Sequence, residues 1–490
     1  MRWTVADVAK ALGVSTPSLQ FPLARLVGVS IDSRTVKPGE LFFAIRGPRH
    51  DGHTYVASSL AAGALAAVVE NSRLAEFPED IRPKLLPVDD TTRSLQELSS
   101  KYLDAWRQSK SGRRLAAVTG SAGKTTTKEI LAALLAARRR VLKSEGNLNN
   151  EYGLPLTLFR LEDDHDAAVV ELGMSHRGEL ARLAEIARPD VGVVTNVAPV
   201  HLEFFSSVDE IALAKRELIE GLGGDNPVAV LNADDERVSR FAEGFRGSVR
   251  YFGSSERAEF RADNIDDRGL DGSAFDFEGP DELGRLTLPL AGRHNILNAL
   301  AALAAASEWG VGLAEAREVF PSLQPASMRG EILRFADGFT VINDCYNSNP
   351  VALVRMVDLL CATPGYRRRI LVTGEWREIG AESAKLHAEG GSYAAGKKAI
   401  DWIFGVEGHA KNFVEGAIAA GHPSDRAEFF PSSEDAARFL LSFISPGDLV
   451  LVKGSRGVHM EVIAKALEER FALAGNDREV VVKSGREGRS

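Results

Sequence analysis

The segment that most limits how this chain can fold lies at residues 119–127 and reads Thr-Gly-Ser-Ala-Gly-Lys-Thr-Thr-Thr. An apolar run leads into it at 115–118, and a helix-forming sequence follows at 128–135. A strand, a glycine loop and a helix in this order form a cradle in which backbone N–H groups and the helix N-terminus bind phosphate. The segment therefore predicts a nucleotide site; the alternative is an ordinary glycine turn between a strand and a helix.

Two side chains of this loop have defined tasks in a phosphate cradle. Lys124 would reach the β- and γ-phosphates, and Thr125 would offer its hydroxyl to Mg²⁺. The predicted phosphate-binding residues are Gly120, Ser121, Ala122, Gly123, Lys124, Thr125 and Thr126.

Length and composition narrow the class of protein. A chain of 490 residues exceeds what one hydrophobic core usually organises, so we expect about three domains. The net charge of −9 argues against general affinity for nucleic acid or anionic membranes. Two cysteines are too few for a disulfide framework or a cysteine-rich metal site. Because the sequence has no apolar signal core and no long apolar run, we expect a cytoplasmic protein without membrane insertion. We also expect a monomer, but the sequence leaves the oligomeric state open.

The order of apolar and polar segments indicates an α/β fold. From residue 115 onward, apolar strands alternate with amphipathic helices, which is typical of a parallel sheet covered on both faces. A second alternating block begins near residue 339, and a shorter β-containing region precedes both. We therefore predict domains at 1–86, 87–324 and 325–474, and a flexible tail at 475–490.

Polar residues with possible chemistry follow most of the long apolar strands. They are Thr119, Glu171, Asn196, Asn232, Asp344 and Lys453. In open α/β sheets, ligands bind beyond the carboxyl ends of the strands. Because both predicted sheets have polar residues at the carboxyl ends of their strands, we predict two domains that face each other across a cleft.

Glu171 and Lys215 are the candidates outside the loop with the most physical support. Glu171 follows an apolar strand directly, where its carboxylate suits Mg²⁺; the alternative is a structural carboxylate that caps the next turn. On the predicted helix, the neighbours of Lys215 at i±3 and i±4 are all apolar. Burial of an unpaired ammonium is costly and lowers its pKa. The lysine either extends its stem to the surface, or it is neutralised for chemistry or covalently modified.

Weaker candidates share a position in a loop after a strand or at the start of a helix. They are His201, Asn295, Asn298, Arg329, Asp344, Asn347, Lys453 and Arg456. A histidine or arginine in such a place is more often structural or solvated. Asp344 and its neighbouring amides suit a ribose or a metal-bound phosphate, but turns use the same residue types.

Taken in order, these segments resemble the Mur ligases, the ATP-dependent enzymes that build the peptide of peptidoglycan precursors. The family's phosphate loop lacks the first glycine of the general motif, which accounts for Val118. The resemblance runs from about residue 29 to residue 467. Further matches are Glu171-Leu172-Gly173, the loop from Asn196 to His201, the helix of Lys215, Gly292-Arg293-His294-Asn295 and Met328-Arg329.

Within the family, the chain is most similar to the member that joins D-alanyl-D-alanine to UDP-N-acetylmuramoyl-tripeptide. The matching segments are 146–153, 344–350 and 453–456, with 32–53 similar to that member's UDP-sugar-binding domain. The member that adds the third residue typically has Asp-Asn-Pro-Arg in its C-terminal domain. Here Asp225-Asn226-Pro227 precedes Val228 in the central region. One segment departs from the family, with Glu375-Trp376 where Asp-Met is usual.

The resemblance implies a three-domain α/β fold and a reaction. An N-terminal UDP-sugar domain would precede a central P-loop ATPase domain and a C-terminal Rossmann-like domain. ATP would phosphorylate the tripeptide carboxylate, and the amine of D-alanyl-D-alanine would attack the acyl phosphate. Alternatives are another Mur or folylpolyglutamate-type ligase, a nucleotide-driven switch, and a non-catalytic scaffold.

The resemblance also implies roles for single residues. Lys124 would stabilise the transferring phosphate, Thr125 and Glu171 would hold one Mg²⁺, and His201 with a carbamylated Lys215 would help to hold a second. The implied nucleotide-binding residues beyond the loop are Asn295, Asn298, Arg329, Asp344 and Asn347. The implied substrate-binding residues are Ser33, Arg34, Asn149, Asn150, Lys453 and Arg456.

Overall fold

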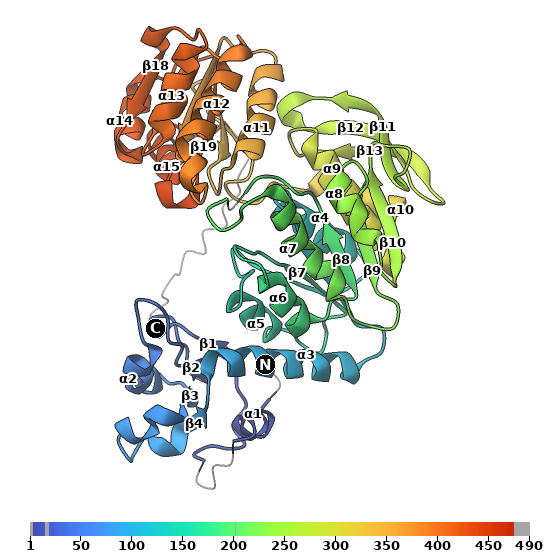
Figure 1. Ribbon diagram of the computed structural model, residues 1–490, viewed down its shortest axis with the longest axis vertical. Helices are drawn as coiled ribbons and strands as arrows, with labels where there is room; N and C mark the ends of the chain where they lie inside the picture. The colour runs from blue at the N-terminus through green and yellow to red at the C-terminus, as the bar shows by residue number, and fades with distance from the viewer. Residues whose placement is uncertain (1–2, 15–18, 201, 475–490) are drawn as a thin grey trace, which may run out of the picture.

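The computed structural model describes residues 3–14, 19–200 and 202–474, and their strands form three sheets (Figure 1). Parallel strands joined by helices dominate each sheet, which confirms the α/β class expected from the sequence. His201 and the predicted tail at 475–490 lie outside the described residues. Within the described residues, no helix is both long enough and apolar enough to cross a membrane.

The N-terminal sheet is parallel, in the order β1-β2-β3-β4. Its strands are β1 (Gly28–Ser30), β2 (Glu40–Phe43), β3 (Ala66–Glu70) and β4 (Leu85–Val88), with helices α1 (Val5–Leu12) and α2 (Val56–Ala61) beside them. The linking helix α3 (Thr91–Ser109) begins at Asp90, whose side chain accepts a hydrogen bond from the backbone N–H of Arg93. Helix α3 packs on α1 and also on α5 (Gly153–Leu158) and α6 (Glu179–Ala187) of the central unit, so it joins the two units.

The central sheet has the order β13-β12-β11-β10-β9-β8-β5-β7-β6, antiparallel only where β12 pairs with β11 and β13. Its strands are β5 (Arg114–Thr119), β6 (Val141–Lys143), β7 (Ala167–Glu171), β8 (Val191–Val194), β9 (Val228–Asn232), β10 (Ser248–Gly253), β11 (Phe260–Asp267), β12 (Ser273–Glu278) and β13 (Leu283–Leu288). Its helices are α4 (Lys124–Ala136), α5 (Gly153–Leu158), α6 (Glu179–Ala187), α7 (Val208–Glu220), α8 (Glu236–Ser239), α9 (His294–Ala306) and α10 (Leu313–Val319).

Strand β5 explains why this sheet is covered on both faces. Leu115 and Ala117 belong to one hydrophobic cluster, whereas Ala116 and Val118 belong to another, and all four are fully buried. Side chains alternate across a strand, so an unbroken apolar run needs apolar partners on each side. Helices α4 and α9 pack together on one face, and α6 and α7 contribute to the cluster on the other.

The C-terminal sheet has the order β14-β15-β19-β16-β17-β18 and is parallel except at β14. Its strands are β14 (Glu331–Arg334), β15 (Thr340–Asp344), β16 (Arg368–Gly374), β17 (Trp402–Val406), β18 (Ala427–Phe430) and β19 (Asp448–Lys453). Its helices are α11 (Pro350–Ala362), α12 (Ser383–Gly396), α13 (Ala410–Ala419), α14 (Ser433–Phe443) and α15 (Glu461–Arg470).

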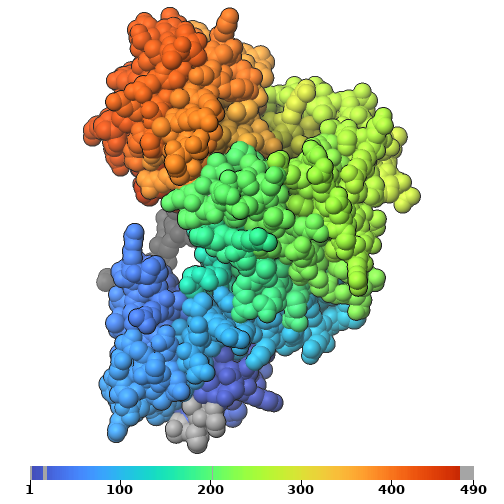
Figure 2. All heavy atoms as spheres, in the orientation of Figure 1, coloured from blue at the N-terminus to red at the C-terminus, as the bar shows by residue number. Residues whose placement is uncertain are grey.

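The C-terminal unit sits against the central unit, at the opposite end of the molecule from the N-terminal sheet (Figure 2). Arg334 of β14 forms an ion pair with Asp271 of the central unit at 2.6 Å. The backbone N–H of Glu203 donates to the carbonyl of Glu378 at 3.3 Å. The second of these contacts brings the loop after β16 next to the loop after β8.

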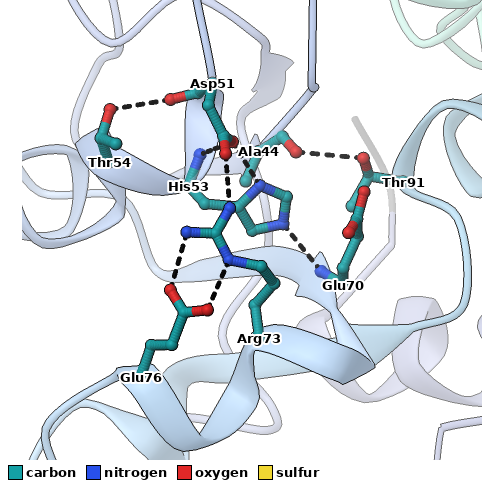
Figure 3. Close-up of polar contacts among 8 residues, drawn as sticks. All are labelled: Ala44, Asp51, His53, Thr54, Glu70, Arg73, Glu76 and Thr91. Atoms are coloured by element: carbon teal, nitrogen blue, oxygen red, sulfur yellow. Dashed lines mark hydrogen bonds and ion pairs between the residues drawn. The ribbon is translucent and has the colours of Figure 1, made fainter.

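A polar network stabilises the N-terminal sheet (Figure 3). The ring Nε2 of His53 accepts a hydrogen bond from the Glu70 backbone at 2.9 Å, so its Nδ1 proton faces the Asp51 carboxylate, 2.7 Å away. Arg73 donates to Asp51 and forms an ion pair with Glu76. Desolvation raises the pKa of Asp51, but hydrogen bonds from His53 and Arg73 outweigh it and lower this pKa to about 2.

We expect Asp51→Asn to lower the free energy of unfolding by about 1–2 kcal/mol at neutral pH, because a part-buried ionic hydrogen bond is lost. A carboxylate with a lowered folded pKa contributes its full stability above the unfolded pKa and loses it as pH falls through the folded value. The difference between variant and wild type should therefore stay constant from pH 7 to about pH 5 and shrink below about pH 4. Urea denaturation across this range measures the difference, with Glu79→Gln as the control, because the Glu79 side chain is 93% exposed and lies outside this network. A difference that grew on acidification would contradict the assignment.

Candidate active site

A cavity of about 670 Å³ lies where the central and C-terminal units meet. Predicted site residues from both units line it: Ser121, Ala122, Gly123, Lys124, Thr125, Thr126, Asn149, Asn150, Glu171, Lys215, Asn295, Asn298, Arg329, Asp344, Asn347 and Lys453. Residues predicted for the site that do not line it are Ser33, Arg34, Gly120 and Arg456. The predicted cleft between two sheets is therefore present as a cavity.

Two glycines of the phosphate loop have positive φ angles and close neighbours. Gly120 has φ 148°, and a Cβ there would lie 1.9 Å from Thr195 Oγ1. Gly123, at the start of α4, has φ 84°, and a Cβ there would lie 2.3 Å from Asn298 Oδ1. Both positions require glycine because the backbone passes against other elements in a conformation that L-residues avoid.

We expect Gly123→Ala to lower the free energy of unfolding by about 2–4 kcal/mol, through backbone strain and overlap with Asn298. Gly112 is a matched control, because it has φ 80° and a Cβ added there would meet no heavy atom within 4 Å. Gly112→Ala should cost about 1–2 kcal/mol from backbone strain alone. Equal losses in urea denaturation of the two variants would show that the contact with Asn298 costs nothing.

The loop after β8 holds the phosphate loop in place. The backbone N–H of Ala122 donates to Asn196 Oδ1 at 3.0 Å, and that of Ser121 donates to the Asn196 carbonyl at 3.0 Å. The Thr195 hydroxyl donates to the Ala122 carbonyl at 2.6 Å. Thr195 was not among the predicted site residues, although its place at the end of an apolar strand was a usable signal.

Lys124, Thr125 and Glu171 form the polar centre of the cavity. Lys124 Nζ donates to the Gly120 carbonyl at 2.8 Å, and the Thr125 hydroxyl donates to Glu171 Oε2 at 2.6 Å. Asn149 Nδ2 donates to Glu171 Oε1 at 2.9 Å. Desolvation lowers the pKa of Lys124 from its ordinary value, and the charge of Glu171 partly opposes this shift. The strand end therefore carries its carboxylate to the hydroxyl of the loop, as the sequence predicted.

A second buried lysine, Lys128, is connected to Glu171 through Ser144. Lys128 is 1% exposed; its Nζ donates to the Ser144 carbonyl at 2.6 Å and pairs with Glu129 at 2.8 Å. The Ser144 hydroxyl accepts a hydrogen bond from the Glu171 backbone at 3.1 Å. Sequence reasoning missed Lys128, although its neighbours Leu131 and Ala132 at i+3 and i+4 are as apolar as those of Lys215.

Lys215 is 2% exposed on α7 and lines the cavity, so its stem does not extend to the outer surface. It forms no hydrogen bond and no ion pair with another described residue. Desolvation, and then the nearby charge of Lys124, lower the pKa of Lys215 well below its ordinary value. Burial therefore argues against the alternative in which the stem reaches the surface. The other interpretation of the sequence, an amine neutralised for chemistry or covalently modified, stays a prediction.

Asparagines on α9 lie beside the phosphate loop. Asn298 Nδ2 donates to Asn295 Oδ1 at 2.9 Å, and Asn295 Nδ2 donates to the Ala291 carbonyl at 2.8 Å. Asn298 Oδ1 also accepts from the Thr127 hydroxyl at 3.4 Å. The two residues share one face of the helix, as predicted, and Asn298 connects that face to Gly123.

The C-terminal unit contributes cations to the opposite wall. Lys453 is 2% exposed, and its Nζ donates to Asp344 Oδ2 at 2.6 Å and to the Asn347 carbonyl at 3.0 Å. The Arg329 guanidinium lies 4.0 Å from the centre of the Tyr346 ring. Further arginines that line the cavity, and that sequence reasoning missed, are Arg355 of the C-terminal unit and Arg177 and Arg182 of the central unit.

Residues predicted for the site but outside the cavity have other partners. Arg34 pairs with Asp32 at 2.7 Å, with its side chain 86% exposed. Arg456 pairs with Glu461 at 3.4 Å. In the departing segment, Trp376 is 1% exposed and stacks on His387 with ring centres 4.3 Å apart. The tryptophan therefore packs inside the C-terminal unit and not at the cavity wall.

Three family models and the curated relatives all match this chain to Mur ligases. The Mur ligase family catalytic domain matches residues 25–103, the Mur ligase middle domain matches 118–306, and the Mur ligase glutamate ligase domain matches 328–456. The chain is 32% identical over 466 residues to the UDP-N-acetylmuramoyl-tripeptide--D-alanyl-D-alanine ligase of Bacillus subtilis (strain 168), covering 95% of this chain and 98% of that one.

Solved structures agree over nearly the whole chain. MurF from Acinetobacter baumannii superposes with a TM-score of 0.84 at 30% identity, covering 96% of this chain and 99% of that one. MurF ligase from Thermotoga maritima, in complex with ADP, superposes with a TM-score of 0.77 at 27% identity, covering 93% and 99%. Sequence, architecture and site geometry therefore agree that the chain belongs to the Mur ligase family.

Proposed function

We propose that this chain is the ATP-dependent ligase that joins D-alanyl-D-alanine to the terminal carboxylate of UDP-N-acetylmuramoyl-tripeptide. The names of the relatives, which it matches over nearly its whole length, support this reaction. One observation carries the proposal: the phosphate loop with Lys124 and the Thr125–Glu171 pair faces Lys453 and Asp344 across one cavity. Since the reaction consumes ATP and a UDP-linked precursor, we propose a cytoplasmic location.

The proposed reaction has two steps. A tripeptide carboxylate oxygen bonds to the γ-phosphorus of ATP, and the bond from that phosphorus to the bridging oxygen breaks, which releases ADP. The amine nitrogen of D-alanyl-D-alanine then attacks the acyl carbon, the carbon–oxygen bond to phosphate breaks, and the amine proton leaves to solvent. Phosphoryl transfer needs mainly positioning and charge neutralisation, which Lys124 and the loop N–H groups supply.

The residues at the loop fit a divalent cation. The Thr125 hydroxyl and Glu171 carboxylate, 2.6 Å apart, are hard oxygen ligands of the kind that Mg²⁺ prefers. Bound Mg²⁺ would supply positive charge against the phosphate oxygens. The described residues contain no cluster of three His, Cys, Asp or Glu side chains suited to a metal. A second ion would therefore depend on oxygen atoms of a carbamylated Lys215 and on His201, outside the described residues.

We propose further residue roles, which the family resemblance implies. We assign Asn295, Asn298 and Arg329 to the nucleotide, with Asp344 and Asn347 on its ribose side. We assign Ser33 and Arg34 to the UDP-sugar, and Asn149, Asn150, Lys453 and Arg456 to the peptide substrates. The units would comprise residues 1–86 for the UDP-sugar domain, 87–324 for ATP binding and 325–474 for the second ligase domain.

A substrate-panel assay tests the function. Purified protein receives ATP, UDP-muramoyl-tripeptide ending in diaminopimelate or in lysine, and either D-alanyl-D-alanine or single amino acids. We expect ADP release to need the tripeptide, and product mass to show the added dipeptide. ATP turnover without an acceptor would instead indicate a nucleotide switch, and addition of a single amino acid would indicate another ligase of the family.

A further inference from the structure

Arg355 is a cation in the cavity wall that the proposed reaction has not yet used. It lies on α11 of the C-terminal unit and lines the cavity with Ala352 and Met356 of the same helix. It forms no hydrogen bond and no ion pair with another described residue. The carboxylate nearest to it along the helix, Asp358, pairs with Lys397 at 2.5 Å and accepts from the Tyr393 hydroxyl at 2.7 Å.

This arrangement leaves a desolvated guanidinium without an anionic partner. Burial lowers the pKa of Arg355 from its ordinary value, and no neighbouring charge offsets that shift. An unpaired cation beside a cavity is costly unless a ligand contacts it. Arg355 is therefore suited to touch whatever the cavity binds.

The charged groups that line the cavity differ between the two ends of the proposed nucleotide site. Lys124, Glu171 and Lys215 gather at one end, where charge neutralisation serves the transferring phosphate. His294 lies one turn before Asn298 on α9, which is about 6 Å along the helix axis from the contact with the phosphate loop. Burial, and then the charge of Arg355, lower the pKa of His294 to about 3, so a neutral imidazole lies near the guanidinium.

We propose that Arg355 binds the nucleoside end of the nucleotide, with its guanidinium plane against the base, and so completes the site from the C-terminal unit. This inference rests on the proposed ATP-dependent function. A guanidinium is planar and weakly hydrated, and it stacks readily on aromatic faces, including those of nucleic acid bases. Because the phosphate loop belongs to the central unit, Arg355 would make nucleotide affinity depend on the C-terminal unit as well.

Calorimetric titration of the full chain with two probes tests the contact. ADP carries the nucleoside and phosphates, whereas inorganic triphosphate carries phosphates alone. We expect Arg355→Met to raise the Kd for ADP about tenfold, as loss of a desolvated cation–aromatic contact predicts, with no change for triphosphate. In the ligation assay, the KM for ATP should rise about tenfold with kcat within about twofold.

Arg438→Met is the matched control, because Arg438 is a 74% exposed arginine of the same unit, on α14. Arg355→Lys should recover only part of the ADP affinity, since an ammonium lacks the planar fork. Unchanged ADP affinity in Arg355→Met, or equal losses for both probes, would overturn the inference while leaving the proposed function intact. A wild-type chain that binds no ADP would overturn the proposed function and this inference together.

Discussion

Lys124→Met is expected to lower kcat for ligation by about 10³-fold or more, the usual scale for loss of a cation that stabilises a transferring phosphate. Lys124 Nζ lies 2.8 Å from the Gly120 carbonyl. Beyond desolvation, the charge of Glu171 raises the pKa of Lys124, and the charge of Arg329 lowers it. The position of Lys124 at the start of α4 puts its charge where the loop N–H groups and the helix N-terminus also point. Steady-state ADP release and product formation measure the effect.

Two controls separate lost chemistry from lost structure. Lys465→Met removes a 76% exposed lysine of α15 and should leave kcat within about twofold. Lys124→Met itself should unfold at a temperature close to that of the wild type, because it replaces a desolvated ammonium with an apolar side chain of similar length. A folded Lys124→Met protein with more than about a tenth of wild-type kcat would refute the role of Lys124.

Lys215→Met is expected to lower kcat by about 10²–10³-fold while keeping or raising the thermal stability. The amine is 2% exposed and has no partner among the described residues, so its removal relieves a desolvation cost. Selection for folding alone would place an apolar residue there. An inactive but more stable variant would thus identify a residue retained for the reaction.

Carbamylation of Lys215 is tested separately. Desolvation and the charge of Lys124 lower the pKa of this amine, which favours the uncharged form that attacks carbon dioxide. The new carbamate would supply oxygen ligands where the structure has a nitrogen. We expect protein prepared in ¹³C-bicarbonate to show one carbamate carbon signal that is absent from Lys215→Met. A ligand-bound, active enzyme whose Lys215 carries no carbamate would disprove the modification.

Local sequence patterns predicted the parts of the site that lie within one element or its ends. The glycine loop between an apolar strand and a helix predicted the cradle, and the apolar neighbours of Lys215 predicted its burial. Glu171 was predicted near the loop because the ends of parallel strands meet at one edge of a sheet. Its observed partner, the Thr125 hydroxyl, confirms that reasoning.

Contacts between distant elements were missed for a physical reason. Lys128 reaches Ser144 and so Glu171, Thr195 holds the loop from β8, and Arg355 enters the cavity from α11. Each contact depends on how helices and sheets pack, and residue spacing in the chain does not encode that packing directly. Arg34 is a case of the opposite kind, because the sequence predicted it as a site residue but its exposed side chain does not line the cavity.

The sequence by itself determined the α/β class, the phosphate loop, and the family resemblance that implies an ATP-driven ligation. It did so because periodicity, glycine conformation and strand-end chemistry are local properties. The tertiary structure alone decided that the two sheets present their polar ends to one cavity, and that Gly123 abuts Asn298. It also decided that Arg355 lacks a partner among the described residues there, because cavity walls arise from packing between units that are far apart in the chain.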